Sequence, residues 1–416
     1  MTTKDLDAVV AGHLCLDFFP LFQGSSDFPL EQLFRPGTLL GVGPATLRTG
    51  GAVANTGLAL ARIGSSVAFC ARVGDDALSR LTVEILSQGG STDGIRRCPG
   101  TAGSYTVVLA PPGVDRIFLH YSGPNDSFGL EDIDFSLIER ARILHFGYPP
   151  LMRRIYSDGG RELALIFQEA RACGAIVSLD MALFDPAGQA AAVDWPAFLA
   201  TILPHVDLFL PSAEEALLML DPTHYMDLCR THPGITPVIQ LSPAELAGLT
   251  ERLLSFGAAI VGLKCGPRGL LLRTADRQRL EDVPGLSPAR VLQWADRQQW
   301  CPAYQPLRIR SSTGAGDCLQ AGFLKGLLEG LPLEQVLRVS TAMGYFNLLE
   351  DDASSGIPPW EDVLSLAANH SHPFVDPGVN AADWDFQEDA GMWARNCIAP
   401  GNIIAPGNII APGRVL

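Results

Sequence analysis

Ser312-Thr313-Gly314-Ala315-Gly316-Asp317 leads directly into Cys318-Leu319-Gln320-Ala321-Gly322-Phe323-Leu324-Lys325-Gly326, and this stretch decides the fold. Two glycines and an alanine begin a helix, so unpaired backbone N–H groups point outward from its N-terminus. Such donors, together with the helix dipole, bind anions. A carboxylate among them would repel an anion, so Asp317 makes better sense as a base that removes a proton beside a phosphate. The stretch therefore predicts a site of phosphoryl transfer.

Short apolar segments alternate with helical ones along the rest of the chain. The strand candidates are mostly continuous apolar runs, as expected for strands that are covered on both faces. They are Ala8–Leu16, Ser66–Val73, Ile143–Phe146, Ile176–Asp180, Val206–Leu210, Val238–Leu241 and Ala259–Lys264. Helical patterns lie between them at Ala52–Ile63, Arg161–Ala172, Pro243–Phe256 and Leu319–Glu329. This alternation predicts a doubly wound α/β fold with a mainly parallel sheet flanked by helices.

One segment interrupts this alternation. Gly103–Leu109 and Arg116–Tyr121 flank the turn-rich sequence Pro111-Pro112-Gly113-Val114-Asp115, which predicts a β-hairpin. A hairpin inserted into an α/β chain suits a lid, because closure over a cleft excludes water from the chemistry. The alternative is an edge ribbon with a purely structural role.

Composition narrows the class of protein. The chain has 416 residues, 47% of them hydrophobic, and a formal net charge of −15. That charge argues against nucleic acid and anionic membranes as partners, and no apolar run approaches the length of a membrane span. The nine cysteines form no C-x-x-C pair, and the start of the chain is polar rather than leader-like. We therefore expect reduced thiols, a cytoplasmic location and a small-molecule partner.

A second glycine-rich segment runs from Thr49 to Gly64. Gly50 and Gly51 begin a helical pattern, where a glycine pair lets a ligand come close to the backbone. Asn55 follows one turn later, and its amide both donates and accepts hydrogen bonds, as the binding of a polyol requires. Taken alone, the pair could equally form a tight turn, with Asn55 as an ordinary polar residue of the helix.

Both glycine-rich segments, in this order, resemble those of the ribokinase/PfkB-type carbohydrate kinases. The first stretch comprises Gly50-Gly51, Asn55, Ala61-Arg62-Ile63-Gly64 and Val73-Gly74-Asp75-Asp76, and the second comprises Thr313-Gly314-Ala315-Gly316-Asp317 and Gly322-Phe323. Between them, segments 101–105, 120–125 and 261–270 look like the family's lid and its nucleotide-side strand and turn. The resemblance runs from about Val9 to Leu366 and implies a ribokinase-like fold with a small β lid.

The resemblance also implies an ATP-dependent kinase that phosphorylates a hydroxyl group. Asp317 would act as the general base, and the N–H groups of Gly314, Ala315 and Gly316 would stabilise charge on the γ-phosphate. The remaining residues implied are Asp17, Gly50, Gly51 and Asn55 for the acceptor, Lys264, Gly266, Gly269 and Thr313 for the nucleotide, and Glu215 for Mg²⁺ through a water molecule.

Two positions depart from the family's usual pattern. Ser212 stands where an Asn-x-x-Glu motif has its asparagine, although Glu215 retains the acidic position, so magnesium binding that is weaker or mediated by water is implied. Ser311 stands where an aspartate commonly precedes the second motif, which puts a monovalent-cation site in doubt.

The chain divides into two predicted parts. Residues 1–368 would form the kinase domain, with lid elements at roughly 17–47 and 100–127, and a homodimer through that lid is an assembly the resemblance allows. Residues 369–416 would form a C-terminal extension that ends in an Ala-Pro-Gly-Asn-Ile-Ile repeat. Two and a half repeats are too few to fold alone, so we expect them to pack on the main domain or to form a flexible tail.

Alternative classes of function are weaker. Gly41-Val42-Gly43 has Thr46 where a dinucleotide fingerprint needs its third glycine, and no Walker-A motif is present. A catalytically silent, ligand-sensing kinase homologue is the main rival, because Ser212 and Ser311 differ from the pattern.

The acceptor is predicted to be neutral. The lid strand Thr101–Leu109 lacks basic residues that would hold a second phosphate, although Arg96 and Arg97 precede it. A free sugar or polyol, such as ribose or fructose, is therefore favoured. A nucleoside is the alternative, and the aromatic platform it needs would come from Phe18, Phe19, Tyr105 or Phe128.

Overall fold

The computed structural model describes residues 4–22, 35–37, 39–112, 116–350, 355–369, 371–380 and 382–396. In this part of the chain no helix is long and apolar enough to cross a membrane. The eight cysteines in it are all free thiols.

The main sheet is mainly parallel, as predicted. Within the described residues it has eleven strands in the order β14-β15-β13-β12-β11-β10-β9-β8-β1-β4-β5. The seven strands from β11 to β5 run parallel, and β12, β13, β15 and β14 add antiparallel pairs at one side. The strands are β1 (Leu6–Gly12), β4 (Val67–Val73), β5 (Ser91–Arg97), β8 (Ala141–Gly147), β9 (Ile176–Asp180), β10 (Leu208–Phe209), β11 (Ile260–Lys264), β12 (Leu270–Thr274), β13 (Arg297–Cys301), β14 (Asp385–Gln387) and β15 (Met392–Asn396).

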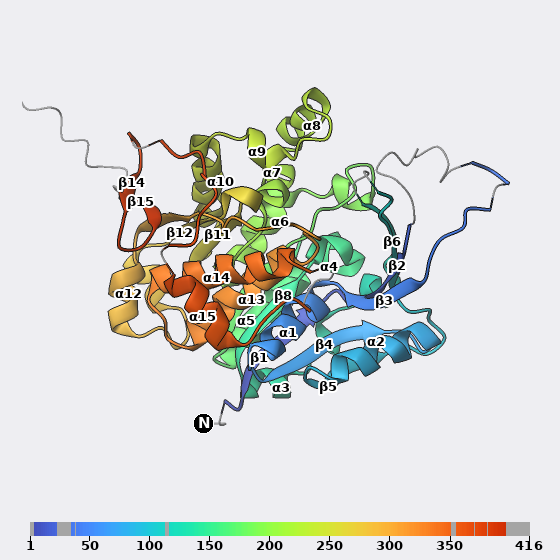
Figure 1. Cartoon of the computed structure of the whole chain (residues 1–416). Coiled ribbons are helices and arrows are strands. Elements are labelled where there is room, and N and C mark those ends of the chain that lie inside the picture. Colours follow the sequence, from blue (N-terminus) through green and yellow to red (C-terminus); the bar gives the residue numbers. More distant parts are fainter. Residues whose placement is uncertain are drawn as a thin grey trace, which may run out of the picture.

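Helices cover both faces of this sheet (Figure 1). Alternate residues of a strand point to opposite faces, so Val9 and Ala11 enter one hydrophobic core while Ala8 and Val10 enter the other. The helices are α1 (Ala52–Arg62), α2 (Ala77–Ser87), α3 (Phe135–Arg140), α4 (Arg153–Ser157), α5 (Arg161–Ala172), α6 (Trp195–Ile202), α7 (Ala213–Leu220), α8 (Pro222–Thr231), α9 (Pro237–Gln240), α10 (Pro243–Ser255), α11 (Arg277–Glu281), α12 (Pro288–Trp294), α13 (Ala315–Leu328), α14 (Leu333–Leu348) and α15 (Trp360–Ala368). Short 3₁₀ turns lie at Gly123–Ser127, Leu130–Asp132, Pro149–Leu151, Gln189–Ala192, Leu203–His205 and Gly266–Arg268.

Two of the predicted strands differ from the structure. Val238–Leu241 is wrong as a strand: Pro237 begins the short helix α9 there, and four residues of which three are apolar do not distinguish a strand from a helix. The predicted strand Ala8–Leu16 breaks after Gly12, whose φ of +119° turns the chain. The residues beyond the break leave the main sheet and join a second one.

A second, smaller sheet has the strand order β3-β2-β6-β7. It consists of β2 (Cys15–Pro20), β3 (Ala45–Gly50), β6 (Tyr105–Leu109) and β7 (Ile117–Tyr121). The antiparallel pairing of β6 with β7 confirms the predicted hairpin. At its end, Arg116 donates a hydrogen bond from Nη2 to Ser312 Oγ over 2.9 Å, so the hairpin reaches the turn that precedes α13.

The C-terminal segment joins the main sheet as far as it is described. β15 pairs antiparallel with β13, and both β14 and β15 lie at the upper left of Figure 1, while β2, β3 and β6 lie at the right. The buried Arg268 donates from Nε to the carbonyl of Pro377, which ties the extension to the β11–β12 turn. The repeat at 398–413 lies outside the described residues.

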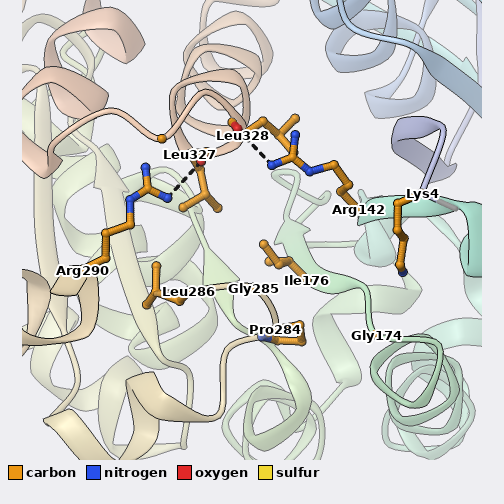
Figure 2. A pocket seen from close by; sticks show the side chains of 11 residues that line it. Lys4, Arg142, Gly174, Ile176, Pro284, Gly285, Leu286, Arg290, Leu327 and Leu328 are labelled. Carbon is orange, nitrogen blue, oxygen red and sulfur yellow. Dashed lines mark hydrogen bonds between the residues drawn. The ribbon is translucent and has the colours of Figure 1, made fainter. Parts of the chain in front are cut away.

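A cavity of about 500 Å³ lies beside the C-terminus of α13 (Figure 2). Its cations are engaged with main-chain carbonyls: Arg142 donates to Leu328, and Arg290 donates to Leu327 and Leu331. Positive charge at a helix C-terminus is stabilising, because the carbonyls there carry partial negative charge. These contacts fix the far end of the helix whose other end carries Asp317.

Candidate active site

The parallel strands bring several chemically active side chains to one edge of the main sheet. β1, β8, β9, β10 and β11 are neighbours that run in the same direction, so their carboxyl ends meet there. At or just beyond these ends stand His13, Tyr148, Asp180, Ser212 and Lys264. The N-terminus of α13 lies over the same edge, since Asp317 accepts hydrogen bonds from Tyr148 and Gly316 approaches Lys264.

The turn before α13 has the form expected of an anion cradle. Gly314 is the N-cap residue with φ +78°, a left-handed conformation that favours glycine. The N–H of Ala315 donates to Ser312 over 3.3 Å, a long bond with which a phosphoryl oxygen can compete. Ser311 accepts from the N–H of Thr313 over 3.1 Å, so its hydroxyl supports the turn.

Asp317 lies buried at the centre of the site and is 4% exposed. Asn55 Nδ2 donates to Oδ2 over 3.1 Å, and Thr56 Oγ1 donates to Oδ1 over 3.3 Å. The hydroxyl of Tyr148 lies 2.7 Å from Oδ1 and 2.8 Å from Oδ2. The two glycine-rich segments of the sequence, far apart in the chain, therefore meet at this carboxylate.

The protonation of this cluster follows from its burial and charges. Burial raises the pKa of Asp317, against the opposing effects of Lys264 and of the donors on Tyr148, Asn55 and Thr56. Burial and the Asp317 charge hold the pKa of Tyr148 well above its usual range, so its phenol remains a hydrogen-bond donor.

Lys264 is the cation of the site. Its Nζ lies 2.6 Å from Asp180 Oδ1, and a Cβ added at Gly316 would stand 3.4 Å from the same Nζ. Although burial lowers the pKa of Lys264, the carboxylates of Asp180, Glu215 and Asp317 outweigh it, so its pKa is raised. One lysine thus stands among three carboxylates, directly beside the anion cradle.

Glu215, in the first turn of α7, forms a reciprocal cap with Ser212, the residue that precedes the helix. Its Oε2 accepts from the N–H of Ser212 over 2.7 Å, and its own N–H donates to the Ser212 hydroxyl over 3.1 Å. The neighbouring Asp180 retains a buried Oδ2 without a hydrogen-bond partner among the described residues. An unpaired carboxylate oxygen at this position fits a hydrated Mg²⁺ ion, which binds oxygen ligands and keeps several waters.

The residues predicted for the acceptor lie together where the main sheet meets the small one. Asp17 on β2 is partly buried, and burial raises its pKa, while Cys15 and Thr106 oppose that rise by donating to the carboxylate. A Cβ at Gly50 would stand 2.1 Å from Asp17 Oδ2, and one at Gly51 would stand 2.5 Å from the carbonyl oxygen of His13. Gly51, with a φ of +84°, therefore requires glycine, whereas a side chain at Gly50 would displace the Asp17 carboxylate.

The predicted nucleotide residues are more spread out. Gly266 and Gly269 shape the turn after β11, and a Cβ at either would meet Val238 or the backbone near Cys301 rather than the Asp317 cluster. Thr313 stands in the cradle itself, and its buried Oγ1 has no hydrogen-bond partner among the described residues.

Sequence reasoning missed four residues that the structure places here: Thr56, Arg116, Tyr148 and Asp180. Asp180 carried a usable signal, because a polar residue at the carboxyl end of a buried parallel strand often lies at the ligand site. Tyr148 carried none, since nothing local marks a tyrosine with φ +66° as a partner of Asp317.

Comparison with known proteins gives one family. The model of the pfkB family of carbohydrate kinases matches residues 27–360. The protein named "Probable fructokinase-6, chloroplastic" of Arabidopsis thaliana is 26% identical over 344 residues, covering 80% of this chain and 73% of that protein. Fructokinase-1 of Oryza sativa subsp. japonica is 29% identical over 370 residues, covering 85% and 95% respectively.

Solved structures share the fold. A ribokinase of Arabidopsis thaliana complexed with ribose and ATP has a TM-score of 0.62 at 17% identity, covering 87% of this chain and 98% of that one. A protein of E. coli in complex with ATP and Mg²⁺ has a TM-score of 0.60 at 18% identity, covering 87% and 98%. At these identities the likeness shows a ribokinase-like fold.

Proposed function

The chain belongs to the pfkB family of carbohydrate kinases, and from this we propose that it transfers the γ-phosphate of ATP to a hydroxyl of a neutral sugar or polyol. The family predicted from the sequence is confirmed, and with it a phosphotransferase that acts on an alcohol group. The observation that carries the mechanism is the 3.1 Å contact between Asn55 and Asp317, because it joins the acceptor segment to the anion cradle.

Asp317 is the proposed general base. An acceptor held by Asp17, Asn55 and the backbone at Gly50-Gly51 would place a hydroxyl beside the carboxylate, which takes its proton as the oxygen attacks phosphorus. Tyr148 donates to both oxygens of that carboxylate, so its phenol occupies the place that an acceptor hydroxyl would take. We infer that the acceptor displaces the phenol from one of them.

Charge on the transferring phosphoryl group would be stabilised by the N–H groups of Gly314, Ala315 and Gly316. Lys264 adds a positive charge at the same turn. Arg116 reaches this turn from the hairpin through Ser312, which supports the assignment of the small sheet as a lid. We assign Thr313 and the turn at Gly266 and Gly269 to the nucleotide-binding part of the site.

ATP with Mg²⁺ is the proposed phosphoryl donor. The unpaired Oδ2 of Asp180 and the carboxylate of Glu215 fit a hydrated magnesium ion, which would neutralise phosphate charge. Both carboxylates stand close enough to Lys264 to raise its pKa, so they share one charged environment. A monovalent cation stays an open part of this proposal, since none of the site residues that the structure describes singles one out.

The lid favours a neutral acceptor. Next to the acceptor residue Asp17 stand Cys15 and Thr106, neither of them a cation, and the Asp17 carboxylate would repel a second phosphate. Two arginines lie elsewhere in the lid: Arg116, just before β7, contacts Ser312 on the phosphoryl side, and Arg48 on β3 stands opposite Asp17 in the β2–β3 pairing. Arg48 is therefore the residue that a phosphorylated acceptor would use.

A screen for ADP release measures acceptor choice. We expect the highest kcat/KM on a neutral sugar or polyol, with fructose 6-phosphate and nucleosides slower, and we expect Arg48→Met to change kcat/KM little on the neutral substrate. Faster turnover of fructose 6-phosphate that falls in Arg48→Met would overturn the neutral acceptor. Sugar binding without any ADP release would instead favour the ligand-sensing homologue.

A nucleoside is the second candidate acceptor. Phe18 and Tyr105 of the lid form an edge-to-face pair with ring centroids 6.2 Å apart, and Tyr121 lies 5.7 Å from Tyr105. Successive side chains of a strand point to opposite faces, so these rings lie on the face of the small sheet away from Asp17, and Phe19 is the predicted aromatic residue on the Asp17 face that would stack on a base. Phe128 is wrong for that role, because it is fully buried in the main core.

The pH dependence of the reaction tests the part played by Tyr148. Its O–H stabilises the charged form of Asp317 and so lowers the pKa of that carboxyl. Tyr148→Phe removes this effect, and we expect the acidic limb of kcat/KM to move to higher pH by about one unit. Tyr156→Phe, a tyrosine outside the site, should leave the limb in place. If the acidic limb of kcat/KM lies at the same pH in Tyr148→Phe as in the unaltered enzyme, the phenol does not affect the pKa of Asp317.

A homodimer through the lid and a cytoplasmic location stay predictions. Large apolar side chains are exposed on the lid strands, which suits an interface; they are Leu47, Phe118, Leu119 and Tyr121.

A further inference from the structure

Three side chains with strong affinity for transition metals gather beside the acceptor residues without a role in the mechanism above. They are His13, Cys15 and His120, and each offers one ligand atom, all within 4.8 Å of one another. His13 and Cys15 are buried where β1 passes into β2, whereas His120 comes from β7 and is open to solvent. The cluster therefore joins the main sheet to the lid.

The spacing of the two imidazoles suits a bound metal ion. Their Nε2 atoms lie 3.2 Å apart. Two nitrogen ligands of a tetrahedral zinc ion, each at about 2.0–2.1 Å, stand about 3.3 Å from one another. The thiol of Cys15 completes three corners of such a site, and a tetrahedral ion would have one position left.

The surroundings of the imidazoles also suit metal ligation. Thr106 Oγ1 lies 3.1 Å from His120 Nδ1, and in the tautomer in which Nδ1 donates to this hydroxyl, Nε2 carries the lone pair that would bind a metal. His13 Nδ1 is buried and has no hydrogen-bond partner among the described residues, so its N–H would stay unpaired when Nε2 binds the metal, a cost that the three ligand bonds must outweigh.

We propose that His13, Cys15 and His120 bind one Zn²⁺ ion whose fourth position opens toward the acceptor pocket. Nitrogen and sulfur donors select zinc-class ions over Mg²⁺, so the magnesium needed for phosphoryl transfer does not compete. On binding, the Cys15 thiol gives its proton to solvent and its sulfur bonds to the metal, with no change of oxidation state. The hydrogen bond from that thiol to Asp17 Oδ1, 3.2 Å long, is then lost.

Zinc bound here would inhibit the kinase. The ion and its fourth ligand would stand next to Asp17, the proposed acceptor residue, and would hold the lid strand β7 in its present position against the main sheet. We expect inhibition by Zn²⁺ that is competitive with the acceptor and not with ATP at saturating Mg²⁺. This consequence rests on the proposed function, whereas metal binding itself does not.

Titration of the full-length protein with Co²⁺ and Zn²⁺ tests the site. Co²⁺ should give a thiolate-to-metal charge-transfer band that saturates at one equivalent. Added Zn²⁺ should displace the Co²⁺ and abolish this band. Competition with a chromophoric chelator then measures the affinity for Zn²⁺. Cys15→Ser and His120→Ala should each weaken binding by about 100-fold or more, and Cys15→Ser should remove the charge-transfer band. Cys229→Ser and His232→Ala, matched losses of a thiol and an imidazole outside the site, should bind as the unaltered chain does. Far-ultraviolet circular dichroism confirms that each variant is folded.

The outcomes separate the two proposals. Full binding in Cys15→Ser, or equal weakening in Cys229→Ser, would overturn the zinc site whatever the kinase activity. A metal complex that depends on Cys15 in a protein without ADP release would support the site and refute the proposed function. Zinc inhibition that is competitive with the acceptor and relieved in His120→Ala would support both.

Discussion

Replacement of Asp317 by asparagine is expected to lower kcat by about 10²–10⁴-fold, because the acceptor hydroxyl loses its base. Binding of ATP and acceptor should persist, since asparagine has the same size. Its amide group can face the hydroxyls of Thr56 and Tyr148, which rotate to accept, while its oxygen still accepts from Asn55. Steady-state kinetics together with calorimetric binding of each substrate would separate a loss of chemistry from a loss of binding.

Stability gives this variant a second readout. Because burial raises the pKa of Asp317, its charged form is disfavoured in the folded protein at neutral pH, and removal of the charge should leave the melting temperature unchanged or raise it. Asp227→Asn, at an exposed aspartate on α8 paired with Arg230, is a matched control that should keep full activity. A loss of less than tenfold in Asp317→Asn would remove the residue from its role as base.

The elements that the sequence predicts well are those with a strong local signal. The helix patterns at Ala52–Ile63 and Arg161–Ala172 became α1 and α5 almost without change. The order of the two glycine-rich segments also allowed Asn55 and Asp317 to be placed at one site. A fold in which strand ends converge on one edge then supplies the contact between them.

The sequence did not predict the residues whose role depends on contacts with distant parts of the chain. Lys264 could be assigned to the nucleotide side, but its pairing with Asp180 joins β11 to β9, and neither residue marks the other in the sequence. The change of sheet at Gly12 depends on a single positive φ. The approach of His120 to His13 requires the whole lid to be in place.

Replacement of Lys264 by methionine is expected to destabilise the protein by about 3–5 kcal/mol, because it leaves the buried Asp180 without its counter-charge. Methionine matches the length of the aliphatic stem, so the loss is mainly electrostatic. The kinase reaction should slow as well, since the positive charge beside the cradle at Gly316 is gone. Urea unfolding and steady-state kinetics measure the two effects separately.

The pH dependence and a double variant identify the cause of that destabilisation. Burial already raises the pKa of Asp180, with Lys264 as the main opposing influence, so Lys264→Met raises it further. A carboxyl whose folded pKa lies above its unfolded value destabilises the fold increasingly as pH rises above the unfolded value, so the loss should be larger at pH 8 than at about pH 5. Asp180→Asn combined with Lys264→Met replaces the ion pair with two neutral groups and should recover most of the stability without recovering the activity. A double variant as unstable as Lys264→Met alone would show that lost packing, and not the uncompensated carboxylate, is responsible.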